Sequence, residues 1–388
     1  MPRKFQWFLL FVVSVSFFPL AAYAGEGVNM NLQKVWWNVS PPDDSTLSAL
    51  TQENQQRLNV AAADGFKLVR VLFPISWIEA DAPSSQRQAT LKLVSSFVSQ
   101  ANALGMRAII AVTGDSGTSN KQDLVCHQQN VLIQSLMEIA RVIPDSPMAG
   151  IETLNEPPNG CSGSESWLAV QQQIYQALRS LKKQILIVVT EGEWGSLDGL
   201  LKFDPSFYRN DPGVLFTFHY YEPFLFTSQG SSNAAPGCYK YVHDLSWPYD
   251  GTVSQVEASA LQLLSADSSA DDKKRNDCRN RLTTDLAHYQ QTGAPGYAES
   301  RFGEVAVWAQ RAGIQPNRIL VGEIGVLRTQ KTAGSPRAGA AGWLSAATAA
   351  ARHYGFVWAA YDLDTTFAID CGQPPAEKMC SEYVGALQ

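Results

Sequence analysis

Short apolar runs rich in β-branched residues alternate along the chain with longer segments whose apolar positions recur at helical spacing. The pattern predicts strands at 27–31, 67–73, 106–112, 148–155, 184–190, 213–220, 318–323 and 355–361. Amphipathic helices are predicted between them, for instance at 52–64, 88–104, 128–142, 164–182, 300–312 and 338–353. Nearly continuous apolar strands that alternate with helices are typical of a parallel sheet covered on both faces. Eight such units predict an α/β fold, a closed (β/α)8 TIM barrel.

An open, doubly wound sheet is the alternative arrangement of alternating strands and helices. Such a sheet usually carries a glycine-rich phosphate-binding loop, GxGxxG, after its first strand. The segment GEGVNMN at 25–31 does not have that form. The sequence therefore favours the closed barrel.

The repeat is irregular in two places. The predicted sixth strand ends at 220 and the seventh begins at 318, and the residues between are rich in Ser, Ala and Asp. We interpret about 223–299 as an insertion on the loop face of the barrel, because an apolar pattern appears only in a helix near 278–292. Only 26 residues follow Asp362, so the eighth helix must be short or missing.

The N-terminus has the pattern of a secretory signal peptide. A basic start, MPRK, precedes an apolar stretch and then Ala22-Tyr23-Ala24, an A-x-A site. We predict a signal peptide at 1–24 and a single domain at 25–388, exported to the periplasm or the medium. An uncleaved membrane anchor is the alternative. No later stretch is long and apolar enough to span a bilayer, so no stable membrane insertion is expected after cleavage.

Six cysteines, all in the predicted mature part, fit an exported chain with disulfide bonds. An even count in such a chain predicts pairing, although six cysteines allow 15 pairings. We expect neighbours in the sequence to pair, as Cys126–Cys161, Cys238–Cys278 and Cys371–Cys380. Free, buried thiols are the alternative.

Composition and charge exclude several kinds of partner. Hydrophobic residues make up 45% of the chain and charged residues 17%, which is a globular composition. The net charge of −6, without any run of Lys or Arg, argues against nucleic acid. No CxxC and no His pair at metal-ligand spacing occur, so we expect no metal and no organic cofactor. We also expect a monomer.

Two glutamates lie at the ends of predicted strands, where a barrel carries its reactive groups. In such barrels the reactive groups lie where strands end and βα loops begin. Glu156 ends the predicted fourth strand, and Glu323 ends the seventh between Gly322 and Gly325. Paired carboxylates about 5–5.5 Å apart serve a retaining glycosidase, whereas about 6.5–9.5 Å would mean inversion of configuration.

Three motifs in order resemble glycoside hydrolase family 5, the cellulase family. They are Leu-Asn-Glu-Pro at 154–157, His219-x-Tyr221 on the sixth strand and Gly-Glu-Ile-Gly at 322–325 on the seventh. The segment FHYYEPFLFT at 218–227 also resembles bacterial cellulases. The resemblance covers most of 27–362 and implies a retaining hydrolase of β-linked oligo- or polysaccharides, most often β-1,4-glucan.

The resemblance also implies roles for individual residues. Glu156 would be the acid/base and Glu323 the nucleophile of a double displacement. Asn155 would bind the sugar 2-hydroxyl, while Arg70 and Tyr221 would orient Glu323. His219 would lie beside the acid/base.

Family members often carry a histidine at the end of strand three and a tryptophan platform on strand eight. This chain has Thr113 near the first position, and Tyr361 at the second with Trp358 three residues earlier. We count Trp194, Trp358 and Tyr361 as candidate sugar-stacking residues. The departures put in doubt which sugar is bound, and β-mannan stays open as a substrate.

Other interpretations stay open at this stage. A polysaccharide-binding or export-assembly protein on an inactive barrel is one, although the chain keeps both glutamates. Arg70 could be the buried partner of Glu152, to which we assign a structural role inside the barrel. The sequence does not distinguish endo from exo action.

The implied mechanism requires two adjacent residues of the LNEP segment to face the same side. Pro157 favours an extended backbone at Glu156, and strict alternation would send Asn155 and Glu156 to opposite faces of the strand. The implied mechanism needs both in the cleft. We therefore predict that regular pleating ends at these two residues.

Overall fold

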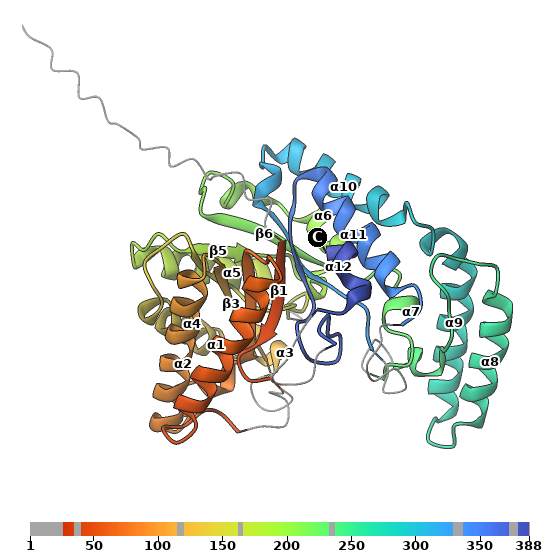
Figure 1. The fold of residues 1–388 in the computed structure, drawn as a ribbon, viewed down its shortest axis with the longest axis horizontal. Coiled ribbons are helices and arrows are strands. Elements are labelled where there is room, and N and C mark those ends of the chain that lie inside the picture. The colour runs from red at the N-terminus through yellow and green to blue at the C-terminus, as the bar shows by residue number, and fades with distance from the viewer. Residues whose placement is uncertain are drawn as a thin grey trace, which may run out of the picture.

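The computed structural model describes residues 26–34, 40–114, 120–161, 166–232, 237–328, 337–371 and 379–387. The strands in these ranges are β1 (Glu26–Asn31), β2 (Leu68–Pro74), β3 (Arg107–Thr113), β4 (Ala149–Glu152), β5 (Leu186–Val189), β6 (Val214–Tyr220), β7 (Ile319–Ile324) and β8 (Val357–Ala360). Strands pair in parallel with their neighbours in the chain, and β8 pairs back with β1. The predicted (β/α)8 barrel is confirmed (Figure 1).

Helices follow the strands and form the outer layer of the molecule (Figure 1). The predicted ones are present as α1 (Leu47–Ala63), α2 (Ser84–Ala103), α4 (Gln129–Val142), α5 (Trp167–Ser180), α10 (Tyr297–Ala312) and α11 (Ala340–Tyr354). Two short helices that the pattern did not predict, α3 (Lys121–Cys126) and α6 (Leu197–Lys202), follow β3 and β5. The last helix, α12 (Ser381–Leu387), is short as expected and packs on α11, where Thr348 donates to the carbonyl of Ala386.

Side chains inside the barrel form an apolar layer with a polar layer above it. The apolar layer is a separate buried cluster of Leu68, Ile109, Leu186, Val188, Leu215, Leu320, Val357 and Ala359. Successive residues of a strand point to opposite faces. Arg70, two residues after Leu68, therefore faces the same lumen, as do Thr217 and His219 after Leu215. The alternation thus delivers polar groups toward the end of the barrel where the strands finish.

A bulge in β7 brings Glu323 into this lumen. Phe218 pairs with Val321, but the next residue of β6, His219, pairs with Glu323, so Gly322 is an extra residue on β7. Regular alternation from Leu320 would leave Glu323 on the outer face, and the extra residue turns it inward. A Cβ at Gly322 would lie only 2.7 Å from Thr217 Oγ1. Glycine is therefore required where β7 passes β6 at this point.

The insertion after β6 holds more regular structure than the sequence predicted. It contains α7 (Phe224–Thr227), a single turn at Tyr239–Tyr241, α8 (Val253–Ala266) and α9 (Asp272–Thr292). The expectation that no apolar pattern precedes 278–292 was wrong. Val256, Ala260 and Leu264 recur every four residues of α8 and are buried. The pattern was weak because Ser and Ala fill six of the 14 positions of the helix.

The helices α8 and α9 form a hairpin that stands out beside the barrel, on the right of Figure 1. The disulfide Cys238–Cys278 ties α9 to the segment that leaves the barrel. Cys126–Cys161 and Cys371–Cys380 are also bonded, so all three predicted pairs are confirmed.

No helix among the residues described above combines the length and the apolar character that crossing a bilayer requires. The predicted signal peptide at 1–24 lies outside those residues.

Candidate active site

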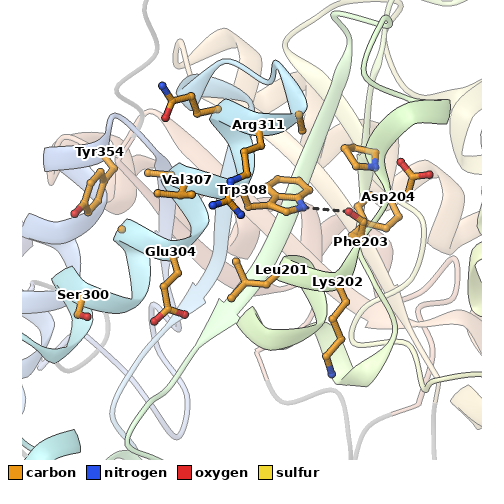
Figure 2. Close-up of a pocket in the computed structure, with 15 residues that line it drawn as sticks. Leu201, Lys202, Phe203, Asp204, Ser300, Glu304, Val307, Trp308, Arg311 and Tyr354 are labelled. Carbon is orange, nitrogen blue, oxygen red and sulfur yellow. Dashed lines mark hydrogen bonds between the residues drawn. The ribbon is translucent and has the colours of Figure 1, made fainter.

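Two cavities among the described residues differ in their surroundings. A groove of about 1020 Å³ lies between α6 and α10 in the outer helical layer. Figure 2 shows its wall, where Trp308 donates from Nε1 to the carbonyl of Phe203. Neither Glu156 nor Glu323 lines this groove. A smaller cleft of about 430 Å³ lies where the barrel strands end, and both glutamates line it.

The cleft has one wall from the barrel and one from the insertion. The barrel wall and its βα loops supply Asn155, Glu156, Tyr221, Glu323, Leu327, Tyr361, Thr366 and Phe367. The insertion and the residues leading into it supply Phe224, Ser228, Ser231, Tyr239 and Arg281. The insertion thus forms part of the candidate site.

Glu323 is buried and held from two sides. Its carboxylate is reached by Arg70, from Nη1 to Oε1 at 2.9 Å, and by Tyr221, whose hydroxyl donates to Oε2 at 2.6 Å. Only 4% of the residue is exposed. One charge-bearing donor and one hydroxyl therefore fix the orientation of this carboxylate and compensate its charge.

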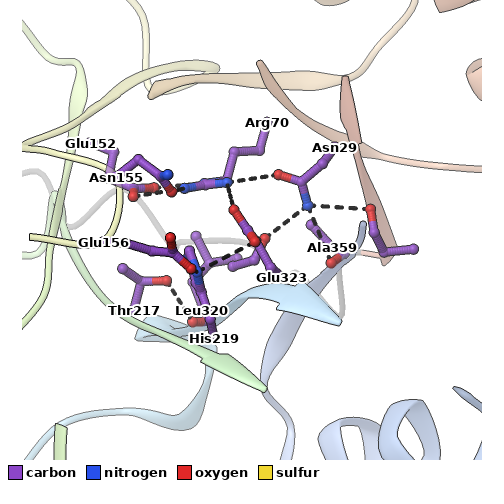
Figure 3. Close-up of polar contacts among 12 residues, drawn as sticks. Asn29, Arg70, Glu152, Asn155, Glu156, Thr217, His219, Leu320, Glu323 and Ala359 are labelled. Carbon is purple, nitrogen blue, oxygen red and sulfur yellow. Dashed lines mark hydrogen bonds and ion pairs between the residues drawn. The ribbon is translucent and has the colours of Figure 1, made fainter. Parts of the chain in front are cut away.

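Arg70 connects Glu323 to the floor of the barrel. Its guanidinium makes a two-point contact with Glu152, at 2.7 Å and 2.8 Å, and donates to the side-chain oxygens of Asn29 and Asn155 (Figure 3). Burial would lower the pKa of Arg70, but Glu152 and Glu323 raise it above its ordinary value. Arg70 is therefore both the buried partner of Glu152 and a contact of Glu323. The sequence left these two roles open as alternatives, and the structure shows both contacts.

The backbone is no longer pleated at Asn155 and Glu156, as predicted, although the strand ends earlier than predicted. Strand β4 ends at Glu152, and Asn155 and Glu156 both line the cleft. The expectation of an extended backbone at Glu156 was wrong, because its φ is 48°. The left-handed turn is held where the carbonyl of Pro157 accepts a hydrogen bond from the Trp194 amide at 3.0 Å. Because of this turn, the neighbouring residues Asn155 and Glu156 can both face the same cleft.

Glu156 has a more open setting than Glu323. Its side chain is 32% exposed and contacts Lys121 Nζ at 3.2 Å from Oε2 and His219 Nδ1 at 3.2 Å from Oε1. Burial would raise the pKa of Glu156, but Lys121 and His219 hold it well below the usual range.

His219 lies between the two carboxylates. Its Nδ1 is 3.2 Å from Glu156 and 3.5 Å from Glu323. One atom from each of the three side chains lies within 4.8 Å of the others, a spacing that a metal ion can also use. Arg70 and Lys121 already contact the two carboxylates, so a divalent cation would meet two positive groups at once.

The three aromatic candidates have different positions. Trp194 is 58% exposed in the loop after β5, and Lys121 Nζ lies 5.7 Å from its ring centroid. Tyr361 lines the cleft beside Tyr221 and Phe367. Trp358 does not reach the cleft.

The position of Trp358 follows from strand alternation. It is 1% exposed and lies next to Arg352 of α11, between barrel and helices. Its neighbours Val357 and Ala359 occupy the inward positions of β8. The proposal that Trp358 contacts substrate is therefore wrong for this structure. Thr113, at the predicted end of β3, is buried.

A family model for cellulases, glycosyl hydrolase family 5, matches residues 28–366. The chain belongs to this family. It is also 24% identical over 209 residues to Endoglucanase 3 of Fibrobacter succinogenes, a match over 53% of this chain and 29% of that relative. The chain thus spans under a third of the length of this curated relative.

Solved structures support the same fold for this family 5 chain. Thermotoga maritima Cel5A in complex with cellobiose is similar with a TM-score of 0.65 and 16% identity, over 95% of this chain and 99% of that one. The same enzyme in complex with mannotriose gives a TM-score of 0.66 at 16% identity, over 95% and 98% of the chains. At this identity the likeness concerns the fold.

Sequence reasoning missed several residues of this site. Asn29 on β1 donates to the carbonyl of Gly322 at 2.9 Å and accepts from Arg70, and its inward position on a predicted strand was an available signal. Lys121, Phe367 and Arg281 come from loops and the insertion, where no periodic pattern indicates which side chains reach the cleft.

Proposed function

We propose that this family 5 protein is an exported, retaining glycoside hydrolase that cleaves β-glycosidic bonds, with β-1,4-glucan as its substrate. The observation that carries the proposal is the pair of glutamates at the barrel mouth. An oxygen of Glu156 and one of Glu323 lie within 4.8 Å of each other. That separation supports retention, because inverting enzymes keep their carboxyl groups about 6.5–9.5 Å apart.

In the first step, an oxygen of Glu323 bonds to the anomeric carbon while the bond from that carbon to the leaving oxygen breaks. Glu156 gives its proton to that oxygen. In the second step, Glu156 takes a proton from a water molecule whose oxygen bonds to the anomeric carbon, and the bond to Glu323 breaks. Two inversions return the original configuration.

The settings of the two glutamates support this division of roles. Glu323, contacted by Arg70 and Tyr221, is the more buried and more firmly oriented carboxylate, as a nucleophile requires. Glu156 is reachable from the open side of the cleft, where a leaving group and later a water molecule must arrive. Formation of the ester at Glu323 removes a negative charge near Glu156, which favours the ionised form that acts as a base.

The remaining residues would bind the sugar. Asn155, held by Arg70 at 2.7 Å, is placed to contact the 2-hydroxyl of the sugar at the reaction centre. Tyr361 lies on the Glu323 side of the cleft and would contact that sugar. Trp194 lies on the Glu156 side and would support the leaving sugar. The likeness to a mannotriose complex makes β-mannan the second candidate substrate.

Hydrolysis of an aryl β-cellobioside and of a panel of β-glycans tests the proposal. The wild type should release product with retained anomeric configuration by NMR. Glu323→Ala should lose on the order of 10⁴-fold or more in kcat, because the nucleophile is gone. Glu304→Gln, an outer-groove change on α10, is the matched control and should keep full activity.

A wild type that turns over none of the β-glycans would favour the inactive, polysaccharide-binding interpretation. Net inversion of the anomer would exclude the double displacement.

Export is the second part of the proposal. Three disulfides among the described residues support an oxidising compartment. Fractionation of cells that express the full chain should find the protein in the periplasm or the medium. Size-exclusion chromatography should give a monomer.

A further inference from the structure

Lys121 is a cation that contacts the candidate acid/base, and the double displacement described above gives it no role. It is the first residue of α3, and its side chain is 16% exposed. Its ammonium lies 3.2 Å from Glu156 Oε2 and 5.7 Å from the ring centroid of Trp194. The group therefore lies close to both the proton donor and the exposed ring that would support the leaving sugar.

The position of Lys121 is built into the fold from both ends of α3. At its start, the side chain of Asn120 caps the helix by accepting from the Asp123 amide at 3.0 Å. At its end, Cys126 is bonded to Cys161, five residues after Glu156 in the chain. The lysine and the glutamate thus belong to two segments that are covalently joined. Their contact is a property of the architecture.

The charged and titratable groups near Glu156 come from several elements. They are Lys121 on α3, His219 on β6, Tyr221 after β6, Glu323 on β7 and Tyr361 after β8. Lys121 and His219 favour ionisation of Glu156, whereas a negative charge on Glu323 would oppose it. Two further cations are engaged elsewhere, Arg70 with Glu152 and Glu323, and Lys202 with Glu193.

The Lys121 contact conflicts with the first chemical step. A general acid must hold a proton when the leaving oxygen departs. A cation within about 4–6 Å favours the deprotonated carboxyl. Lys121 is the strongest such influence on Glu156 after burial, which acts in the opposite direction. Either the lysine serves another purpose or it controls when Glu156 is protonated.

We propose that Lys121 is a positioning residue that orients Glu156 toward the leaving-group side and holds it as a carboxylate while that side is empty. A sugar over Trp194 would take up hydrogen bonds from the Lys121 ammonium and so release Glu156 to hold its proton. This inference rests on the proposed function. It adds a residue that couples occupation of the leaving-group side to protonation of the acid.

The alkaline limb of kcat/KM against pH tests the role of Lys121, because that limb reports the acid in the free enzyme. A cello-oligosaccharide is the substrate that needs a proton from Glu156. Lys121→Met should move its alkaline limb upward by roughly one pH unit or more. Lys121→Arg keeps the charge and should keep the wild-type limb.

Two controls separate this effect from general damage. Lys202→Met removes a cation of the neighbouring α6 that contacts Glu193, and it should leave the limb in place. A dinitrophenyl β-cellobioside has a leaving group that needs no proton, so Lys121→Met should not move its profile. Near-UV circular dichroism checks that each variant is folded.

A second readout does not require activity. With ¹³C-labelled glutamate carboxyls, Glu156→Gln identifies the Glu156 signal by its disappearance. Titration of that signal should lie roughly one pH unit or more higher in Lys121→Met than in the wild type. A Glu156 titration unchanged by Lys121→Met overturns this inference. If the protein hydrolyses none of the substrates but Glu156 still titrates higher in Lys121→Met than in the wild type, only the proposed function is overturned.

Discussion

Glu156 and Glu323 are the same residue type at the same barrel mouth, yet their surroundings differ in almost every respect. Glu323 lies on a bulged strand, is 4% exposed and contacts Arg70 and Tyr221. Glu156 lies in a loop beyond the end of β4, with a side chain 32% exposed and held by Lys121 and His219. Glu323 therefore stands on a barrel strand and is held by Arg70 of a second strand, whereas Glu156 stands in a loop and is held in part by Lys121 from another loop region.

Removal of Arg70 should have the largest effect, because Arg70 holds Glu323, the more buried of the two carboxylates. Arg70→Met leaves Glu152 and Glu323 buried without their cation. We expect a loss of about 3–5 kcal/mol in the free energy of unfolding, and loss of activity in the fraction that stays folded. Urea denaturation and kcat/KM at low temperature measure the two effects.

Arg57→Met is the matched control for Arg70. Arg57 is 1% exposed and pairs with Asp364 at 2.8 Å, and none of its hydrogen-bond partners lines the cleft. A similar loss of stability is expected, with kcat/KM preserved. Equal losses of kcat/KM in both variants would contradict a direct part for Arg70 in the site.

Gly322→Ala should come next, since it tests the bulge. The new Cβ would lie 2.7 Å from Thr217 Oγ1 and 3.1 Å from the His219 ring, so β7 or β6 must shift. A displacement of Glu323 by about 1 Å should lower kcat/KM by roughly 100-fold. Gly385→Ala on α12, where a Cβ meets nothing within 4 Å, should leave kcat/KM unchanged. Wild-type kcat/KM in Gly322→Ala would show that the bulge does not position the nucleophile.

The smallest effect should come from a substitution beside Glu156, the more exposed of the two carboxylates. Trp194→Ala removes an exposed ring and should raise KM for cello-oligosaccharides by about 2–10-fold, in line with about 0.5–1.5 kcal/mol for an aromatic contact. Trp358→Phe changes a buried ring and should lower thermal stability without changing KM. The reverse pattern would mean that the two rings have been assigned to the wrong places.

Sequence reasoning succeeded where the signal is local or repeats along the chain. The strands and the placement of both glutamates near the carboxyl ends of β4 and β7 follow from periodicity and from short motifs, and the three disulfides join cysteines that are neighbours in the sequence. Strand alternation would also have predicted the position of Trp358 correctly. Trp358 and Tyr361 are an odd number of residues apart, so strand alternation alone separates their faces.

Other features depend on neighbours that are distant in the chain. The bulge at Gly322 exists because β6 and β7 change register beside it, and no pattern within 318–325 states that. Lys121 reaches Glu156 from a different βα loop, through a path set by the Cys126–Cys161 bond. The φ of Glu156 likewise reflects contacts with the β5 loop, which outweigh the local preference imposed by Pro157.

The pairing of Arg70 with Glu152 has a consequence for how such a barrel would lose its function over evolutionary time. A descendant that no longer cleaves sugars could discard Glu323, but discarding either Arg70 or Glu152 alone would leave a bare charge in the barrel floor. The arginine would therefore outlast the activity.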